Sequence, residues 1–243
     1  MQSIKKLLKR LSIVQSALRK FDNQIVRDEF VVKALRDLRD GIVILDAGCG
    51  SQRYRSACAA LQYRTQDFGG YSVDTKKMLG TDGAGGKDGY VYGPLDYVGN
   101  IWKIHEQAEY FDAILCTEVF EHIPYPVETV REFARLLKPG GILILTTPSN
   151  CLRHMDPYYY YSGFSDRWFE KVLTDYGFSV MSIEPVGDYY SWIACEIRRT
   201  LISHSMLSAV PLFPALLYYL LKTPTQISTD TLCMGYHVLA KKV

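Results

Sequence analysis

The chain has 243 residues, of which 48% are hydrophobic and 22% charged, and its formal net charge is +2. This hydrophobic share excludes a disordered chain, because it can form a core that offsets chain entropy, and the length predicts one α/β domain with additions. The small net charge argues against a general nucleic-acid binder.

Basic residues concentrate at the start of the chain. Residues 1–40 contain ten Lys or Arg and five Asp or Glu, whereas the remainder contains 18 and 21. From 4 to 21, apolar residues recur at steps of three and four, which predicts a basic amphipathic helix, and 25–38 predicts a second helix. The first helix could pack on the domain or attach to an anionic membrane surface. We treat 1–40 as an N-terminal segment before the domain.

The six cysteines lie far apart, with no CxxC pair and no zinc-ligand spacing. This pattern predicts free thiols in a reducing compartment. The only early apolar run, Leu11 to Val14, is too short for a secretory signal. We therefore expect a cytoplasmic protein, with peripheral membrane contact as an open option.

Strand and helix patterns alternate from residue 41 onward, so we place the domain at 41–243. Pro139-Gly140-Gly141 predicts a helix stop and a turn. Alternation of this kind indicates an α/β fold with a mostly parallel sheet covered by helices on both faces. The expected strands lie at 42–45, 62–67, 97–98, 111–116, 142–146 and within 231–242, and the clearest helix lies at 127–137.

Two segments depart from this alternation. Residues 69–93 are rich in Gly, which predicts an irregular insertion that serves as a lid or a surface loop. Residues 200–222 are apolar and, up to Leu221, uncharged, but Pro211 and Pro214 interrupt a run shorter than the roughly 20 residues of a membrane span. We expect a hydrophobic cap there, with a homodimer contact or a shallow membrane-facing hairpin at 206–221 as alternatives.

The strongest local signal is a buried strand that ends at Asp46 and leads into Gly48 and Gly50. Glycine permits positive φ and close approach of the backbone to a ligand, and such a turn lies at the ligand-binding edge of an open α/β sheet. A dinucleotide fingerprint would need glycine at position 53, where the chain has Arg53, which argues against NAD or FAD. Asp67, at the end of the next strand, could accept both hydroxyls of a ribose.

Three blocks of the chain together resemble the class I S-adenosylmethionine-dependent methyltransferases, in particular the methyltransferase type 11 group. They are Leu45-Asp-Ala-Gly-Cys-Gly50, the segment from Phe111 to His122, and the segment from Glu132 to Pro148. The resemblance implies a seven-stranded Rossmann-like sheet with one antiparallel strand, and S-adenosylmethionine lying across the ends of the first strands.

The resemblance also implies roles for individual residues. Gly48 and Gly50 would face the methionine part of the cofactor, and Asp46 would anchor its amino group. The other implied contacts are Asp67 at the ribose, Asn100 and Ile101 at the adenine, and Thr117 beside the cofactor. Two residues depart from the family pattern. Gln52 replaces a frequent glycine, and Asn100 replaces the usual Asp and, as a neutral amide, is a weaker hydrogen-bond acceptor than that carboxylate. These departures leave open a non-catalytic protein that binds the cofactor and a partner.

Methyl transfer needs a base only when the acceptor must lose a proton. Glu118 and His122 follow the fourth strand, and His154 begins a tyrosine-rich segment after the fifth, so these three are the catalytic candidates. The histidines could instead brace their loops. The spacing of Glu121, His122, His154 and Asp156 does not select metal ligands, so we expect no metal site.

These observations predict an S-adenosylmethionine-dependent methyltransferase. The aromatic and apolar surroundings expected for the acceptor, together with the basic N-terminal segment, favour a small or lipid-linked acceptor that is methylated at oxygen. The slightly acidic body of the chain disfavours nucleic acid as a partner.

Overall fold

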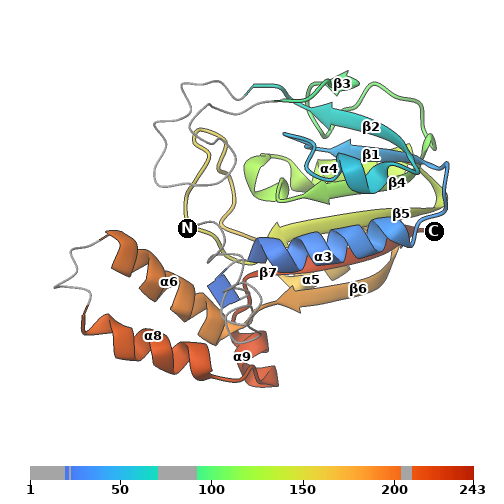
Figure 1. Cartoon of the computed structure of the whole chain (residues 1–243). Helices are drawn as coiled ribbons and strands as arrows, with labels where there is room; N and C mark the ends of the chain where they lie inside the picture. The colour runs from blue at the N-terminus through green and yellow to red at the C-terminus, as the bar shows by residue number, and fades with distance from the viewer. Residues whose placement is uncertain (1–19, 22, 71–91, 204–209) are drawn as a thin grey trace. The chain divides into compact units, whose positions relative to one another are not determined.

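The computed structural model describes residues 20–21, 23–70, 92–203 and 210–243 (Figure 1). Internal contacts divide the chain into two compact units, which we call the helical unit (Met1–Glu29 and Pro185–Gly235) and the sheet unit (Phe30–Glu184 and Tyr236–Val243). The expected boundary at residue 40 stays a prediction. The amphipathic helix expected over 4–21 and the Gly-rich insertion fall almost entirely outside the described residues.

In the described part of the chain, seven strands form one sheet in the order β3-β2-β1-β4-β5-β7-β6 (Figure 1). β1 pairs in parallel with β2 and β4, β2 with β3, and β4 with β5. The sheet is mixed and mostly parallel, which confirms the expected Rossmann-like methyltransferase fold. The strands are β1 (Val43–Ala47), β2 (Gln62–Asp67), β3 (Tyr97–Val98), β4 (Phe111–Thr117), β5 (Leu137–Pro148), β6 (Phe178–Val186) and β7 (Gly235–Lys242).

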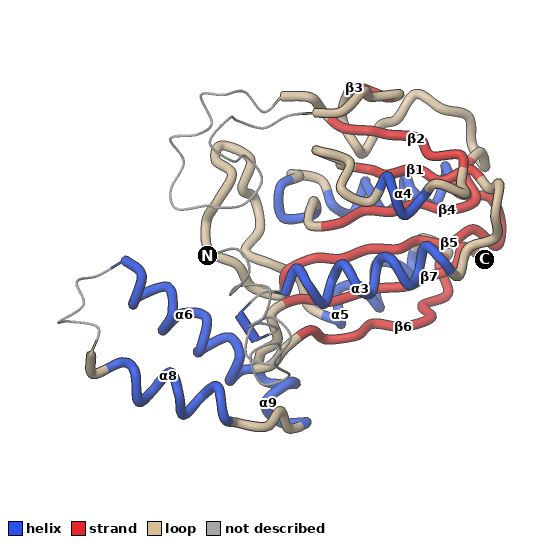
Figure 2. Tube along the Cα trace, viewed as in Figure 1, coloured by secondary structure: helices blue, strands red, loops and turns tan. Residues whose placement is uncertain are grey.

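Apolar side chains of the central strands point alternately to two cores, as the period of two along a strand requires. One core contains Leu45, Ile114 and Leu143, together with residues of α4 (Pro126–Leu136) and α5 (Asp166–Asp175). The other contains Ile44 and Leu115, together with residues of α3 (Asn23–Arg36) and the 3-10 helix η1 (Arg55–Cys58). Helices therefore cover both faces of the sheet (Figure 2).

One turn prediction was wrong. Pro139, Gly140 and Gly141 lie inside β5 rather than between a helix and a strand. Leu137 pairs with Phe111, and the register then shifts before Ala113 pairs with Ile142, which leaves the extra residues as an irregularity in the strand. α4 already ends at Leu136.

The helical unit contains α6 (Tyr189–Ser203), α8 (Leu212–Leu221) and α9 (Gln226–Thr231). Buried Asp188 joins two of these helices: its carboxylate accepts hydrogen bonds from the Ser191 amide (2.9 Å) and hydroxyl (2.6 Å) at the start of α6, and from the Ser228 hydroxyl of α9 (2.8 Å). Among the described residues, no helix has the length and apolar character needed to cross a membrane.

Candidate cofactor and acceptor site

Asp67 joins the loops that follow β1 and β2. Its side chain is 4% exposed, and its two carboxylate oxygens accept hydrogen bonds from the amides of Gly50 (3.0 Å) and Gly69 (3.2 Å). The Gly48 amide donates to the Gln66 carbonyl (2.9 Å). The structure thus brings Gly48, Gly50 and Asp67 together at the carboxyl ends of parallel strands, where open α/β sheets bind ligands.

Gly48 cannot be replaced without strain. Its φ is +72°, and a Cβ atom at this position would lie 2.5 Å from Cγ2 of Val119, a distance that real contacts do not show. Val119 follows β4, so the glycine lets the turn after β1 pass close to the end of the neighbouring strand.

Asp46 is a second buried carboxylate at this edge. It is 3% exposed and accepts a hydrogen bond from the Tyr63 hydroxyl. Burial raises the pKa of Asp46 to about 7, and the negative charge of Asp67 adds to the shift; burial also raises the pKa of Asp67. Two buried carboxylates that repel each other suit a ligand that brings positive charge and hydroxyl groups.

Gln52 lies where the resemblance has glycine, and its backbone adopts the left-handed conformation (φ 59°) that glycine favours. Its side chain is buried, and Nε2 donates to the Pro94 carbonyl (2.6 Å), while Oε1 accepts from Arg55 (2.7 Å). The departure from glycine therefore adds a link between the turn after β1 and the residues before β3.

The two residues expected at the adenine differ in exposure. Ile101 is 4% exposed and belongs to the core, whereas Asn100 is exposed and its carbonyl accepts from the Lys103 amide (3.0 Å). Thr117 is half-buried at the end of β4 and lies opposite Thr146 of β5. Of these three, Asn100 and Thr117 are at least partly accessible to a ligand.

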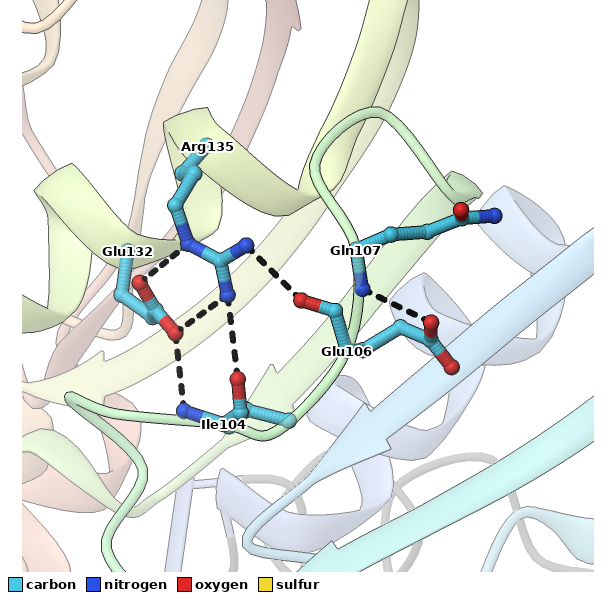
Figure 3. Close-up of polar contacts among 5 residues, drawn as sticks. All are labelled: Ile104, Glu106, Gln107, Glu132 and Arg135. Atoms are coloured by element: carbon cyan, nitrogen blue, oxygen red, sulfur yellow. Dashed lines mark hydrogen bonds and ion pairs between the residues drawn. The ribbon is translucent and has the colours of Figure 1, made fainter.

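Arg135 of α4 fastens the loop that follows Ile101 (Figure 3). It donates to the carbonyls of Glu106 (2.8 Å) and Ile104 (3.0 Å) and forms a two-oxygen pair with Glu132. Glu132 in turn accepts from the Ile104 amide (2.8 Å). Hydrogen bonds from the charged side chains of Glu132 and Arg135, rather than from a helix or strand, thus hold the backbone of this loop in place.

We expect Arg135→Met to raise the KM for S-adenosylmethionine by roughly threefold to tenfold and to leave kcat nearly unchanged, because it releases the loop without touching reacting atoms. The control is Arg131→Met, at an exposed position of the same helix. Steady-state kinetics decide the matter: equal KM values for the two variants would contradict a positioning role.

Glu118 and His122 follow β4. Glu118 has φ 52°, its amide donates to the Thr146 carbonyl (2.9 Å), and its carboxylate accepts from the Thr146 hydroxyl (3.0 Å). His122 ends the 3-10 helix η3 (Phe120–His122), and its Nδ1 lies 2.6 Å from the carbonyl oxygen of Tyr158. Because a carbonyl only accepts, this contact assigns the proton of a neutral ring to Nδ1 and the lone pair to Nε2.

Burial, with a smaller contribution from the nearby His154, lowers the pKa of His122 to about 4. The imidazole is therefore uncharged at neutral pH. Its Nε2 lies 3.6 Å from a Glu121 carboxylate oxygen, and the His122 and His154 rings are 4.6 Å apart at their centroids. The structure thus places two of the three catalytic candidates side by side.

The tyrosine-rich segment after β5, residues 158–161, packs beside these histidines. The amides of Tyr160 and Tyr161 both donate to the Glu121 carbonyl, and the Tyr159 hydroxyl donates to the Cys151 carbonyl. Tyr158 packs edge-on against Phe68, the residue after Asp67, with ring centroids 4.9 Å apart. This contact connects the loop after β2 with the segment that holds His122.

Glu121, His122 and His154 also offer three ligand atoms within 4.8 Å of one another. One carboxylate and two imidazoles are a donor set used for zinc and other divalent metals. Asp156 has a different partner: it pairs with Arg153 at 2.8 Å. Sequence spacing did not single out this cluster, because His154 reaches it only through the loop after β5.

Comparison with known proteins identifies the family of this chain. A family model described as a methyltransferase domain matches residues 18–183. The chain belongs to this methyltransferase-domain family. Its fold and cofactor are those of class I S-adenosylmethionine-dependent methyltransferases, as the sequence predicted.

An individual relative extends the comparison. A "ubiquinone biosynthesis O-methyltransferase" of Xanthomonas oryzae pv. oryzae (strain PXO99A) is 36% identical over 118 residues, which are 48% of this chain and 46% of that protein. The chain thus spans about half the length of the curated relatives it matches.

Solved structures show the same fold at low identity. A geranyl diphosphate methyltransferase in complex with SAM matches with a TM-score of 0.53 at 14% identity, over 90% of this chain and 85% of that one. The phosphoethanolamine N-methyltransferase 2 of Haemonchus contortus, also with S-adenosyl-L-methionine, matches with a TM-score of 0.52 at 17% identity, over 98% and 59%.

The pKa of Asp46 predicts how cofactor affinity depends on pH. Its raised pKa means that the folded chain binds more protons than the unfolded chain between about pH 4 and 7, so this carboxyl lowers stability as pH rises through that window. A cationic cofactor favours the ionised carboxylate, so we expect its affinity to rise nearly tenfold per pH unit up to about 7 and then to level off. Calorimetric titration of Asp46→Asn should show a much flatter profile; an unchanged slope would contradict the role of Asp46.

Proposed function

We propose that this methyltransferase domain transfers the methyl group of S-adenosylmethionine to an oxygen of a small or lipid-linked acceptor, and that it falls in the type 11 group. Two observations support an oxygen acceptor. A curated relative that is 36% identical over 118 residues is named as an O-methyltransferase. A neutral imidazole with an available Nε2 lone pair also follows β4, at the same sheet edge as Asp46 and Asp67. This imidazole carries the proposal.

Asp46 and Asp67 hold the cofactor in this proposal, with the turn at Gly48 and Gly50 facing its methionine part. When bound, S-adenosylmethionine supplies a methyl group already activated by its sulfonium. The protein then has to orient the acceptor in line and remove one proton.

His122 is suited to take that proton. As the new oxygen–carbon bond forms and the sulfur–carbon bond breaks, the hydroxyl proton becomes strongly acidic, so even a base with a pKa of about 4 can accept it at Nε2. The Tyr158 carbonyl keeps the ring in the required tautomer, and Glu121 at 3.6 Å stabilises the imidazolium that results.

A divalent cation at Glu121, His122 and His154 is a second candidate for activating the acceptor, favoured by the 4.8 Å spacing of their ligand atoms. Such an ion would lower the pKa of a coordinated hydroxyl and so replace the base. Dialysis against a chelator separates the two routes. Full activity after chelation would exclude the cation, whereas loss of activity that Mg²⁺, Mn²⁺ or Zn²⁺ restores would favour it.

The test of function is product formation. The chain is incubated with S-adenosylmethionine and a panel of phenols, catechols, hydroxylated amphiphiles and sugars, with amines included as the competing class. Release of S-adenosylhomocysteine and a product heavier by one methylene would support the proposal. Cofactor binding without any methylated product would instead favour the non-catalytic alternative, and methylation of amines alone would contradict an oxygen acceptor.

We expect His122→Ala to lower kcat by roughly a hundredfold while cofactor affinity changes little, because the base acts only in the chemical step. The matched control is His105→Ala, an exposed histidine of the sheet unit. Similar kcat values for the two variants would remove His122 from the chemistry.

A further inference from the structure

Helix α8 of the helical unit has an exposed apolar face. None of its ten residues is buried, and the side chains of Phe213, Leu217 and Leu221 are 54%, 58% and 75% exposed. These three residues recur every four positions, so they lie on one side of the helix. Val210, 58% exposed, lies in the turn before α8, where its carbonyl accepts from the Phe213 amide (3.3 Å). We call Val210, Phe213, Leu217 and Leu221 the α8 face. A contiguous apolar surface of this kind marks a site of interaction.

Lysine and tyrosine residues border the α8 face. Lys222 follows the last residue of the helix, and its Nζ lies 4.5 Å from the ring centroid of Tyr218 and 5.9 Å from that of Tyr190. Tyrosine and lysine beside an apolar surface are typical of the boundary between lipid and water, where both side chains keep a polar end in water.

Positive charge is concentrated on the same unit. Nζ of Lys20 donates to the carbonyls of Leu220 (2.7 Å) and Lys222 (2.6 Å), which attaches residue 20 to the C-terminal end of α8. Residues 1–20 contain six Lys or Arg and no Asp or Glu. The helical unit has ten basic and six acidic residues, whereas the sheet unit has 18 and 20.

We propose that the α8 face binds an anionic lipid bilayer, with the helix lying in the interface rather than across it. Apolar burial and attraction of Lys and Arg to anionic headgroups act together in such a contact. A second copy of the chain fits less well, because a two-fold contact would join two helical units that both carry a positive net charge. The contact needs neither cofactor nor acceptor, so it can be tested separately from methyl transfer.

The experiment is co-sedimentation of the full chain with phosphatidylcholine vesicles, with and without roughly a third of the lipid replaced by phosphatidylglycerol. We expect binding to the anionic vesicles, weaker binding at high salt, and little binding to phosphatidylcholine alone. The variant Phe213→Glu/Leu217→Glu should bind at least roughly tenfold more weakly, because two apolar side chains become charged. Both positions are more than half exposed, so the fold should persist, which circular dichroism verifies.

Met181→Glu is the matched control, since Met181 is 58% exposed on β6 in the sheet unit. It should bind vesicles as the wild type does. The proposal is overturned if the wild type stays in the supernatant with anionic vesicles, or if the double variant binds equally well. It is also overturned if light scattering without lipid shows a dimer that the double variant converts to a monomer. Cofactor binding measured on the same variants reports separately on the proposed function and should not change.

Discussion

Asp67→Ala should weaken S-adenosylmethionine binding by roughly a hundredfold, measured by calorimetry. The carboxylate is buried and accepts from the amides of Gly50 and Gly69, so its loss removes both the proposed ribose contact and the link between two loops. Asp67→Asn should have an intermediate effect, because the amide keeps one oxygen acceptor but loses the charge.

Asp112→Asn is the matched control for this experiment. Asp112 also accepts from a backbone amide, that of Val43 (2.9 Å), and from Lys138 (2.8 Å), but it lies at the beginning of β4, the opposite edge of the sheet. We expect it to lower stability without changing cofactor affinity. If Asp67→Ala bound the cofactor as tightly as Asp112→Asn and the wild type do, the assignment of this edge as the cofactor site would fail.

Gly48→Ala should lower the free energy of unfolding by about 2–4 kcal/mol and also abolish measurable cofactor binding. Part of the loss, about 1 kcal/mol, comes from an alanine at positive φ. The remainder comes from the 2.5 Å approach of the new Cβ to Val119, which forces the turn away from its position. Chemical denaturation measures the stability, and calorimetry the binding.

Gly177→Ala isolates the backbone part of this effect. Gly177 has a similar φ of +81°, but a Cβ atom there would meet none of the described residues within 4 Å. The substitution should cost only about 1 kcal/mol and leave cofactor binding intact. Combining Gly48→Ala with Val119→Ala should recover part of the stability, since it removes the clash. Equal losses for the two glycine variants would show that the contact with Val119 is unimportant.

Much of the fold could be predicted because the central strands are short apolar runs. β2 was predicted with its observed bounds, and β1 and β4 to within two residues. β6 was not predicted, since it alternates poorly and ends near Pro185. The turn predicted at Pro139-Gly140-Gly141 was wrong because pairing of Leu137 with Phe111 extends β5 toward its N-terminus. A tertiary contact of this kind leaves no local signal in the sequence.

The candidate site could be predicted in part because the central strands that carry it are recognisable as short apolar runs. Asp46, Gly48 and Asp67 end or follow predicted strands, so parallel pairing brings them together. The approach of His154 to His122 depends instead on the path of a loop, and burial of Ile101 depends on how its loop packs. The sequence also marked Gln52 as unusual without indicating where its side chain would reach.

The hydrogen bond from the Gln52 side chain to the Pro94 carbonyl has a consequence for turnover. Because Gln52 donates to the Pro94 carbonyl, the turn after β1 and the segment leading into β3 cannot separate without breaking this partly buried hydrogen bond. If the cofactor occupies this edge as proposed, we expect its departure to require both loops to open together, whereas a glycine at position 52 would remove this link between them. Product release, rather than bond making, is where this chain should differ kinetically from relatives with the glycine.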